Sequence, residues 1–384
     1  MNRLLFVLLN LYLYFIWFNA YYPNYSIILS GIIMEIKLAI IGFGNVGQGL
    51  AQILEDKKDF YKNKFQCEFS IVAISDLYKG SLYNPQGLNI TDLLQTVSSG
   101  ESLEILDAPN KGWDALTTIN NSNADIVIEL AFTDLKTGEP ARSHMEAAFT
   151  SGKHFVTTNK GPVALHYKLL KTLSEKHGLM AGIEGTVMSG TPTLTLGKES
   201  LMAANIQSIE GILNGTTNYM LMRMESGLAY DKALEEAQEL GYAEADPSGD
   251  VDGFDAAAKV VILANLLMDA ELTLADVKLT GMSTLTTDDI TKAKQSNECW
   301  KVLGHVNKNS DGSYDAWVKP VQITKQHPLA SVSGAMNAIT YSTELMGDVT
   351  LIGAGAGRVE TGYAVIEDII NIAKNIHLVK ENKS

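Results

Sequence analysis

The chain has 384 residues, of which 46% are hydrophobic and 19% are charged, as in an ordinary globular protein rather than a disordered one. This length is long for a single hydrophobic core, so two domains are expected. A formal net charge of −14 disfavours nucleic acid as a partner. Cys67 and Cys299 are the two cysteines. They are too few for a disulfide framework or a cysteine zinc site, which fits a reducing compartment such as the cytoplasm.

The first 33 residues differ in composition from the rest of the chain. Residues 4–18 read LLFVLLNLYLYFIWF, and this apolar run of about 15 residues is short for a membrane span of roughly 20. Met34 stands directly before a strand-like run. We therefore expect residues 1–33 to be an extension outside the fold, with a signal peptide or a membrane anchor as the alternatives.

From Met34 onward, strand-like and helix-like patterns alternate along the chain. Apolar, strand-like runs occur at 36–41, 69–74, 125–130 and 154–158, with helix-period segments such as 45–56 and 142–151 between them. Strands that are apolar on both faces, separated by helices, indicate a parallel sheet covered on both sides. We assign residues 34–165 to this first domain.

The pattern changes after about residue 180. Strand-like runs at 206–213 and 316–323 mix with longer helical segments at 230–240 and 254–269, which is typical of an α+β domain. We expect this second domain to span residues 166–350. A last helix is expected at 361–376, after a glycine cluster, and the segment 351–384 is expected to return to the first domain.

A glycine-rich loop follows the first predicted strand. In IIGFGNVGQGL, Gly42, Gly44 and Gly47 have the G-x-G-x-x-G spacing, with Asn45 and Val46 completing the loop. The first glycine permits a tight turn, the second allows a pyrophosphate to approach the backbone, and the third lets the helix pack close to the strand. The loop predicts NAD or NADP binding on a Rossmann-type, doubly wound sheet. A purely structural turn is the alternative.

Three residues at predicted strand ends are candidates for cofactor or substrate contacts. Asp76 ends the second strand, where an acid commonly binds the ribose 2′-hydroxyl, although it could equally be a solvated turn acid. It lies 29 residues beyond Gly47, later than the usual spacing of about 20. Thr133 follows the strand at 125–130 and could flank the nicotinamide. Lys160 follows the strand at 154–158, at the edge where ligands bind, or it is a surface charge.

Residues 241–259, GYAEADPSGDVDGFDAAAK, are rich in acidic side chains. Asp246 precedes a proline and is predicted to be a turn acid. Asp252 is predicted to be the N-cap of a helix that begins at Gly253. These two acids are therefore expected to be architectural.

The other acids of this segment are candidates for chemistry. Asp255 and Lys259 are four residues apart and share one helix face. An exposed ion pair is the plain interpretation. However, Lys259 stands between apolar residues, and burial beside an aspartate can tune a lysine as an acid–base group. Glu244 and Asp250 lie on the loop before this helix, free to face a cleft.

The segment AQELGYAEADPSGDVDGFDAAAK, residues 237–259, resembles the signature of homoserine dehydrogenases. The resemblance extends from Met34 to about residue 376, and the other matching segments are TTNKGPVA (157–164), EGTVMSGTP (184–192), GILNGTTNYM (211–220) and GAGAG (353–357). It implies reversible hydride transfer between NAD(P)H and L-aspartate 4-semialdehyde, which gives L-homoserine for threonine, methionine and isoleucine synthesis. A C-terminal regulatory extension is not expected.

The resemblance also implies roles for individual residues. Lys259 would donate the proton to the developing alkoxide and Lys160 would assist it, because hydride arriving at carbon leaves negative charge on oxygen. Asp255 would orient the lysine or hold the substrate amine. The remaining residues implied in the pocket are Glu244, Asp250 and Thr216 for the substrate, and Gly357 for the cofactor. An ammonium group and a lysine explain the acids without a metal cage.

Two further features follow from the resemblance. A monovalent cation, Na⁺ or K⁺, would be bound by Glu184 with backbone carbonyls of Val187, Ser189 and Thr191, although this segment reads MSG where other members often have GAG. An ordinary buried, hydrogen-bonded acid is the alternative for Glu184. The family also suggests a homodimer through the second domain.

Other functions remain possible at this point. One is a related NAD(P)-dependent dehydrogenase of amino-acid metabolism that acts on another small carbonyl compound. Chemistry through a cysteine nucleophile is disfavoured, because neither Cys67 nor Cys299 has an activating sequence context. A non-catalytic NAD-sensing protein is a second alternative. A membrane-anchored binding protein is the third, and it rests only on residues 1–33.

Overall fold

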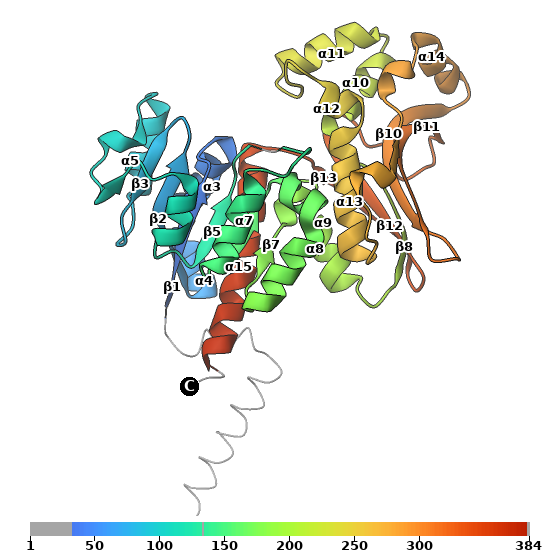
Figure 1. Ribbon diagram of the computed structural model, residues 1–384. Coiled ribbons are helices and arrows are strands. Elements are labelled where there is room, and N and C mark those ends of the chain that lie inside the picture. The colour runs from blue at the N-terminus through green and yellow to red at the C-terminus, as the bar shows by residue number, and fades with distance from the viewer. Residues whose placement is uncertain (1–32, 133, 382–384) are drawn as a thin grey trace, which may run out of the picture.

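The computed structural model describes residues 33–132 and 134–381. Thr133 and all of the predicted extension except residue 33 lie outside these ranges. The described chain forms two units, one around a seven-stranded sheet (sheet A) and one around a six-stranded sheet (sheet B), which stand side by side (Figure 1). Within the described ranges, no helix combines the length and the apolar character that crossing a membrane requires.

Sheet A is parallel through its centre. Its strands are β1 (Met34–Ile41), β2 (Cys67–Asp76), β3 (Gly80–Tyr83), β4 (Asn110–Lys111), β5 (Ile126–Glu129), β6 (His154–Thr157) and β7 (Ala181–Gly182). They lie in the order β4-β3-β2-β1-β5-β6-β7. β2, β1, β5, β6 and β7 run parallel, whereas β3 and β4 form an antiparallel edge. The four strands predicted for this domain are confirmed.

Helices cover both faces of sheet A, as the doubly wound interpretation requires. They are α3 (Asn45–Asp56), α4 (Lys58–Phe65), α5 (Ile90–Ser98), α6 (Ala115–Asn121), α7 (Ala141–Thr150), α8 (Lys160–His177) and α15 (Arg358–Glu381). Leu38 of β1 shares a buried cluster with Leu50 of α3 and Ile369 of α15. Val127 of β5 shares another cluster with Phe149 of α7 on the opposite face. Alternate burial on two faces confirms the α/β fold class.

The C-terminal helix α15 packs directly against α3, beside sheet A (Figure 1). The two helices approach closely because glycines stand at the crossing. A Cβ on Gly49 would lie 2.3 Å from the carbonyl oxygen of Arg358, and a Cβ on Gly362 would lie 3.0 Å from the backbone nitrogen of Leu50. Packing at this distance excludes larger side chains.

Sheet B is mostly antiparallel. Its strands are β8 (Ile206–Ile212), β9 (Val277–Leu279), β10 (Glu298–Lys308), β11 (Tyr314–Thr324), β12 (Met336–Thr343) and β13 (Gly347–Ala354), in the order β13-β12-β8-β10-β11-β9. Only β9 pairs in parallel, with β11, among these strands. The sequence patterns identified β8 and β11 but not β9, β10, β12 or β13.

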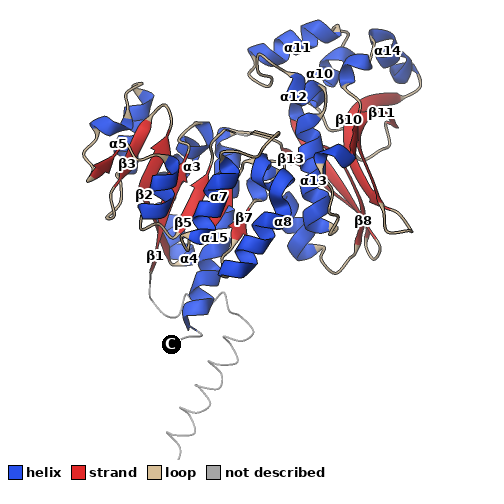
Figure 2. Cartoon of the chain, viewed as in Figure 1, coloured by secondary structure: helices blue, strands red, loops and turns tan. Residues whose placement is uncertain are grey.

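The helices of the second unit are α9 (Thr193–Thr195), α10 (Gly215–Glu225), α11 (Tyr230–Glu239), α12 (Ser248–Val251), α13 (Phe254–Leu267) and α14 (Thr287–Gln295). α13 runs along one face of sheet B, and α10 and α11 lie beyond its N-terminal end (Figure 2). Gly304 of β10 makes room for it, because a Cβ there would lie 2.9 Å from Val260. The other side of α13 contacts α8, so the two units meet along these helices.

The predicted domain limits at 165 and 350 fall inside elements. α8 runs across the first and β13 across the second.

Candidate active site

Two glycines of the glycine loop, Gly42 and Gly47, are required by the geometry of the chain around them. Gly42 has a φ of +91°, and a Cβ there would lie 2.7 Å from the backbone of Leu130. A Cβ on Gly47 would lie 2.7 Å from the carbonyl oxygen of Gly42. These two positions therefore require glycine for turn geometry and helix packing.

Gly44 differs from the other glycines of the loop. It is the N-cap of α3, and a Cβ there would meet nothing within 4 Å. Asn45 and Val46 follow as the first two residues of α3, with no acidic residue in the first turn. The space at Gly44 and the positive end of the helix dipole together suit a pyrophosphate.

Asp76 connects the end of β2 to this loop. Its carboxylate accepts hydrogen bonds from the backbone N–H groups of Phe43 at 2.6 Å and of Tyr78 and Lys79 at 2.9 Å each. Burial raises the pKa of Asp76, but these hydrogen bonds outweigh burial and hold the pKa below its usual value. Asp76 is thus a fixed negative charge beside the glycine loop.

The predicted catalytic side chains lie around the carboxylate of Asp255, at the contact between the two units. Asp255, at the start of α13, accepts from Lys259 Nζ at 2.8 Å, and Lys160 Nζ lies 3.4 Å away. Asn214, which precedes α10, donates its amide N–H to Asp255 at 3.0 Å. Lys160 comes from the unit of sheet A, whereas the other three residues come from the second unit.

Lys259 is buried in this cluster. Its side chain is 7% exposed, and Nζ also donates to the carbonyl oxygen of Leu213 at 2.5 Å. Burial lowers the pKa of Lys259, and Asp255 opposes this effect only in part. Burial raises the pKa of Asp255, but the charges of Lys259 and Lys160 outweigh burial and hold this pKa well below its usual range. Asp255 is therefore ionised in the resting site, and its charge favours the protonated form of Lys259.

Lys160 is the first residue of α8, after the N-cap Asn159. A positive side chain is disfavoured at a helix N-terminus by roughly 0.3–1 kcal/mol, because the helix dipole is positive there. The Asp255 carboxylate compensates for this repulsion. A lysine at an electrostatically unfavourable position, 24% exposed and close to a half-buried carboxylate, is typical of a functional site.

The three predicted substrate residues are not equally placed. Asp250 accepts from Asn214 Nδ2 at 2.6 Å, and burial raises its pKa against that hydrogen bond while the nearby Asp255 raises it further. Thr216 lies in the first turn of α10 and donates to the carbonyl oxygen of Tyr242 at 2.6 Å. Glu244 is exposed, and only its backbone carbonyl has a described hydrogen bond, from Gln238. The structure does not bring Glu244 into the cluster.

The architectural predictions for the acidic segment had different outcomes. Asp246 accepts from the backbone N–H of Ser248 at 3.1 Å, which confirms a turn acid. The prediction that Asp252 caps the next helix is wrong. Asp252 is the C-cap of α12, and Gly253, with a φ of +90°, precedes α13 without a side-chain cap. A left-handed glycine makes the turn between the two helices, so no side-chain cap forms there.

Glu184, proposed from the sequence as a cation ligand, caps a helix in this structure. Its two carboxylate oxygens accept from the backbone N–H groups of Leu194 and Thr195 at 2.8 Å each, and burial raises its pKa. Ser189 bonds through its hydroxyl to Thr361, at 2.7 Å. These interactions fit the alternative interpretation of a buried, hydrogen-bonded acid.

The other residues of the predicted cation set would contribute backbone carbonyls and not side chains. Val187 is buried and apolar, and the carbonyl of Thr191 accepts from Thr193 at 2.6 Å. Among the described residues, no group of three or more His, Cys, Asp or Glu side chains is arranged to hold a metal ion.

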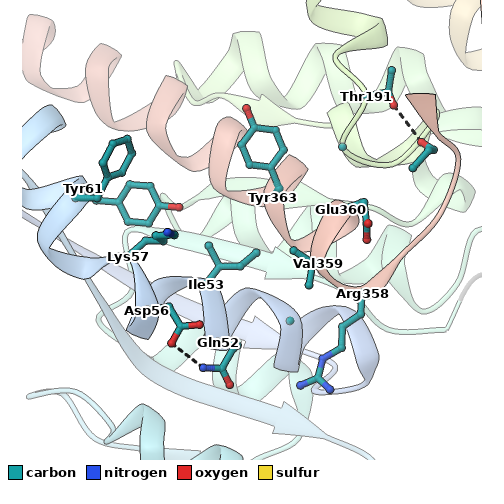
Figure 3. Close-up of a pocket in the computed structure, with 14 residues that line it drawn as sticks. Gln52, Ile53, Asp56, Lys57, Tyr61, Thr191, Arg358, Val359, Glu360 and Tyr363 are labelled. Carbon is teal, nitrogen blue, oxygen red and sulfur yellow. Dashed lines mark hydrogen bonds between the residues drawn. The ribbon is translucent and has the colours of Figure 1, made fainter. Parts of the chain in front are cut away.

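A cavity of about 970 Å³ lies away from the lysines, between α3, α4 and α15 (Figure 3). Ile53, Tyr61, Val359 and Tyr363 are among its lining residues. Neither lysine of the cluster lines it. Gly357 precedes α15, and the neighbouring Arg358 lines this cavity and lies against Gly49 of α3.

Comparisons with known proteins identify the family. Residues 42–181 match the model of the homoserine dehydrogenase NAD-binding domain, and residues 192–370 match the homoserine dehydrogenase model. The NAD(+)-dependent homoserine dehydrogenase of Pseudomonas canavaninivorans is 46% identical over 340 residues, which cover 88% of this chain and 96% of that protein. The chain belongs to the homoserine dehydrogenase family.

Further relatives agree. The homoserine dehydrogenase of Methanocaldococcus jannaschii is 40% identical over 87% of this chain and 98% of its own length. The structure of a hyperthermophilic archaeal homoserine dehydrogenase in complex with NADPH matches with a TM-score of 0.76 and 28% identity, covering 88% of this chain and 98% of that one. The resemblance stated from the sequence is thereby confirmed.

The sequence interpretation missed Asn214, which donates to both Asp250 and Asp255. It lies in GILNGTTNYM, directly after β8 and before α10. Asparagine between a strand and a helix signals an N-cap. That signal could have identified the cap, but its contact with two carboxylates depends on the tertiary structure.

The raised pKa of Asp250 predicts that its ionised carboxylate lowers the stability of the folded protein at neutral pH. A folded-state pKa above the unfolded value contributes stability that is lost as the pH rises through the folded pKa. Asp250→Asn removes this loss, so the melting temperature should rise at neutral pH, with no gain below about pH 3, where the carboxyl is protonated in both states. Calorimetry at both pH values checks this. A lower melting temperature at neutral pH would contradict it.

Proposed function

We propose that this chain is an NAD(P)-dependent homoserine dehydrogenase that reversibly reduces L-aspartate 4-semialdehyde to L-homoserine. The observation that carries the proposal is the Asp255 cluster, in which Lys259 and Lys160 from the two units meet beside one carboxylate. Family membership supplies the substrate. The product would feed threonine, methionine and isoleucine synthesis.

The lysines fit the charge that the reaction develops. When bound, the nicotinamide supplies hydride to the aldehyde carbon or removes it from the alcohol. Reduction places negative charge on the aldehyde oxygen, and we assign Lys259 as the acid that protonates it. Burial lowers the pKa of Lys259, which makes its ammonium a stronger acid. Lys160 provides a second positive charge at the same place.

The acids orient the lysine and bind the substrate. Asp255 and the Leu213 carbonyl hold two of the three Lys259 N–H donors, which leaves one for the substrate oxygen. Asp250 is assigned to the substrate ammonium, with Thr216 beside it. Glu244 would join them only if the segment before α12 moved toward Asp250. The cation assignment at Glu184 stays a prediction, and no step passes through it.

Asp76 favours NAD over NADP. Its carboxylate is held ionised beside the glycine loop by three backbone N–H groups, where it would accept from a ribose 2′-hydroxyl and repel a 2′-phosphate. The open space at Gly44 suits the pyrophosphate of either cofactor. The Pseudomonas relative is named as NAD(+)-dependent.

We also propose a cytoplasmic homodimer. β13 is an edge strand of sheet B. Ile352 on β13 is 50% exposed, and Met336 on the neighbouring β12 is 39% exposed. An unpaired strand edge with exposed apolar residues is suited to self-association.

The catalytic assignment predicts a large effect at Lys259. Purified protein should consume NADH when L-aspartate 4-semialdehyde is added, and Lys259→Ala should lower kcat by about 10²–10⁴-fold. Reduction needs the ammonium form, so its rate should fall as the pH rises through a pKa below the ordinary lysine value. Lys232→Ala, at an exposed ion pair with Glu235, serves as the control. Turnover by Lys259→Ala equal to this control would rule out the assigned role.

Cofactor choice is tested at Asp76. Asp76→Asn removes the charge and keeps an oxygen either for Phe43 or for Tyr78 and Lys79, which bond to different carboxylate oxygens. The ratio of kcat/KM for NADH over NADPH should drop about tenfold, or ~1.4 kcal/mol. Steady-state kinetics with both cofactors measure this ratio. An unchanged ratio would show that Asp76 does not select the cofactor.

Self-association is tested by light scattering on the purified protein. The expected mass is twice that of one chain, and Ile352→Asp should shift it toward one chain because burying a charge at an apolar contact is costly. A single-chain mass for the unmodified protein would refute the dimer.

A further inference from the structure

Asn214 makes three hydrogen bonds from one buried side chain. Its Oδ1 accepts from the backbone N–H of Thr217 at 2.9 Å, which caps α10. Its Nδ2 donates to Asp250 Oδ1 at 2.6 Å and to Asp255 Oδ2 at 3.0 Å. The residue is 5% exposed. Both N–H donors of the amide are thus directed to carboxylates, and its oxygen accepts the capping hydrogen bond.

The orientation of this amide follows from chemistry. A backbone N–H can only donate, and an ionised carboxylate can only accept. Exchanging oxygen and nitrogen in Asn214 would set the N–H₂ group against the N–H of Thr217 and the oxygen against Asp250 and Asp255. The α10 cap therefore fixes which way the amide points.

The amide connects two acids that have different proposed tasks. Asp250 lies on α12 and is assigned to the substrate ammonium, whereas Asp255 lies on α13 and orients Lys259. The other charge facing Asp255 is Lys160, on α8. Asp255 Oδ2 accepts from both Asn214 and Lys259, so the amide restricts the rotation that would carry Asp255 away from the lysine.

We propose that Asn214 is a positioning residue of the reaction centre, whose amide holds Asp250 and Asp255 in one geometry and thereby couples substrate binding to proton transfer at Lys259. This inference rests on the proposed function. It assigns to the residue before α10 a task that its capping role alone does not require.

Two substitutions separate the cap from the amide. Asn214→Ser and Asn214→Asp both keep a side-chain oxygen for the N–H of Thr217, and serine, aspartate and asparagine are similar N-caps. Both remove the donor to the carboxylates. The same substitutions at Asn89 provide a matched control, because Asn89 is the exposed N-cap of α5 and accepts from the N–H of Asp92 at 3.2 Å.

The expected result is a loss of activity without a matching loss of folding. Both Asn214 variants should lower kcat by about 10- to 100-fold, since small displacements of catalytic groups have effects of this size. The acid limb of kcat against pH should move to higher pH, because ionised Asp250 and Asp255 lose a donor and their pKa values rise. The melting temperature of Asn214→Ser should fall further than that of Asn89→Ser, because two carboxylates lose a donor, so kcat is compared per folded molecule at a temperature below both transitions.

Two outcomes would overturn the proposal. In the first, the kcat of the Asn214 variants stays within twofold of that of the unmodified protein, and the acid limb does not move beyond experimental error. The other is a loss of activity that follows the loss of folded protein, with an unchanged acid limb. Either would leave Asn214 as a cap alone.

A titration separates failure of this proposal from failure of the proposed function. Carbon NMR of the aspartate carboxylates reports the titration of Asp250 and Asp255 without any turnover. If the unmodified protein does not reduce the semialdehyde, the function fails, and a higher pKa of these carboxylates in Asn214→Ser still supports the positioning role. Unchanged carboxylate titration in Asn214→Ser contradicts that role.

Discussion

The ion pair between Asp255 and Lys259 is the interaction on which the proposed chemistry depends. A buried ammonium is costly unless a carboxylate pairs with it, and Lys259 has 7% of its side chain exposed. The same carboxylate faces Lys160 at 3.4 Å, at the first turn of a helix whose dipole repels a cation. Without Asp255, two positive side chains from different units would face each other unpaired. The carboxylate therefore holds the reaction centre together at the contact of α8 with α13.

The two units supply complementary parts of this site. Sheet A presents the glycine loop, Asp76 and Lys160 at the carboxyl ends of its strands, the edge where open α/β sheets bind ligands. The second unit presents Lys259 and its carboxylates from the helices that cover sheet B. The C-terminal helix α15 returns to pack on α3, with Gly49 at the crossing. In sequence, the second unit is therefore an insertion between two segments of the first. A substrate bound at Lys259 would thus lie at the edge of sheet A that carries the glycine loop.

The sequence predicted those site features that are local. The spacing of Asp255 and Lys259 places them on one helix face, and the glycine loop follows directly from its strand and helix. Asp252 was mispredicted as a cap, because a left-handed Gly253 makes the turn instead. The approach of Lys160 to Asp255 was implied by the family resemblance and not by any local pattern. The contact of the Asn214 amide with two carboxylates could not be predicted, since it depends on segments that are distant in sequence. For Glu244 the family motif predicted a substrate contact, but its side chain is exposed and lies outside the cluster.

A kinetic cycle on Asp255 and Lys259 tests the central claim most directly. The claim is that Asp255 acts through Lys259, so the two residues form one unit. Residues that act as a unit are strongly non-additive. The kcat of Asp255→Asn combined with Lys259→Ala should therefore equal that of Lys259→Ala alone, to within about threefold. Losses that multiply, so that the double variant is slower by the product of the two single effects, would contradict the account.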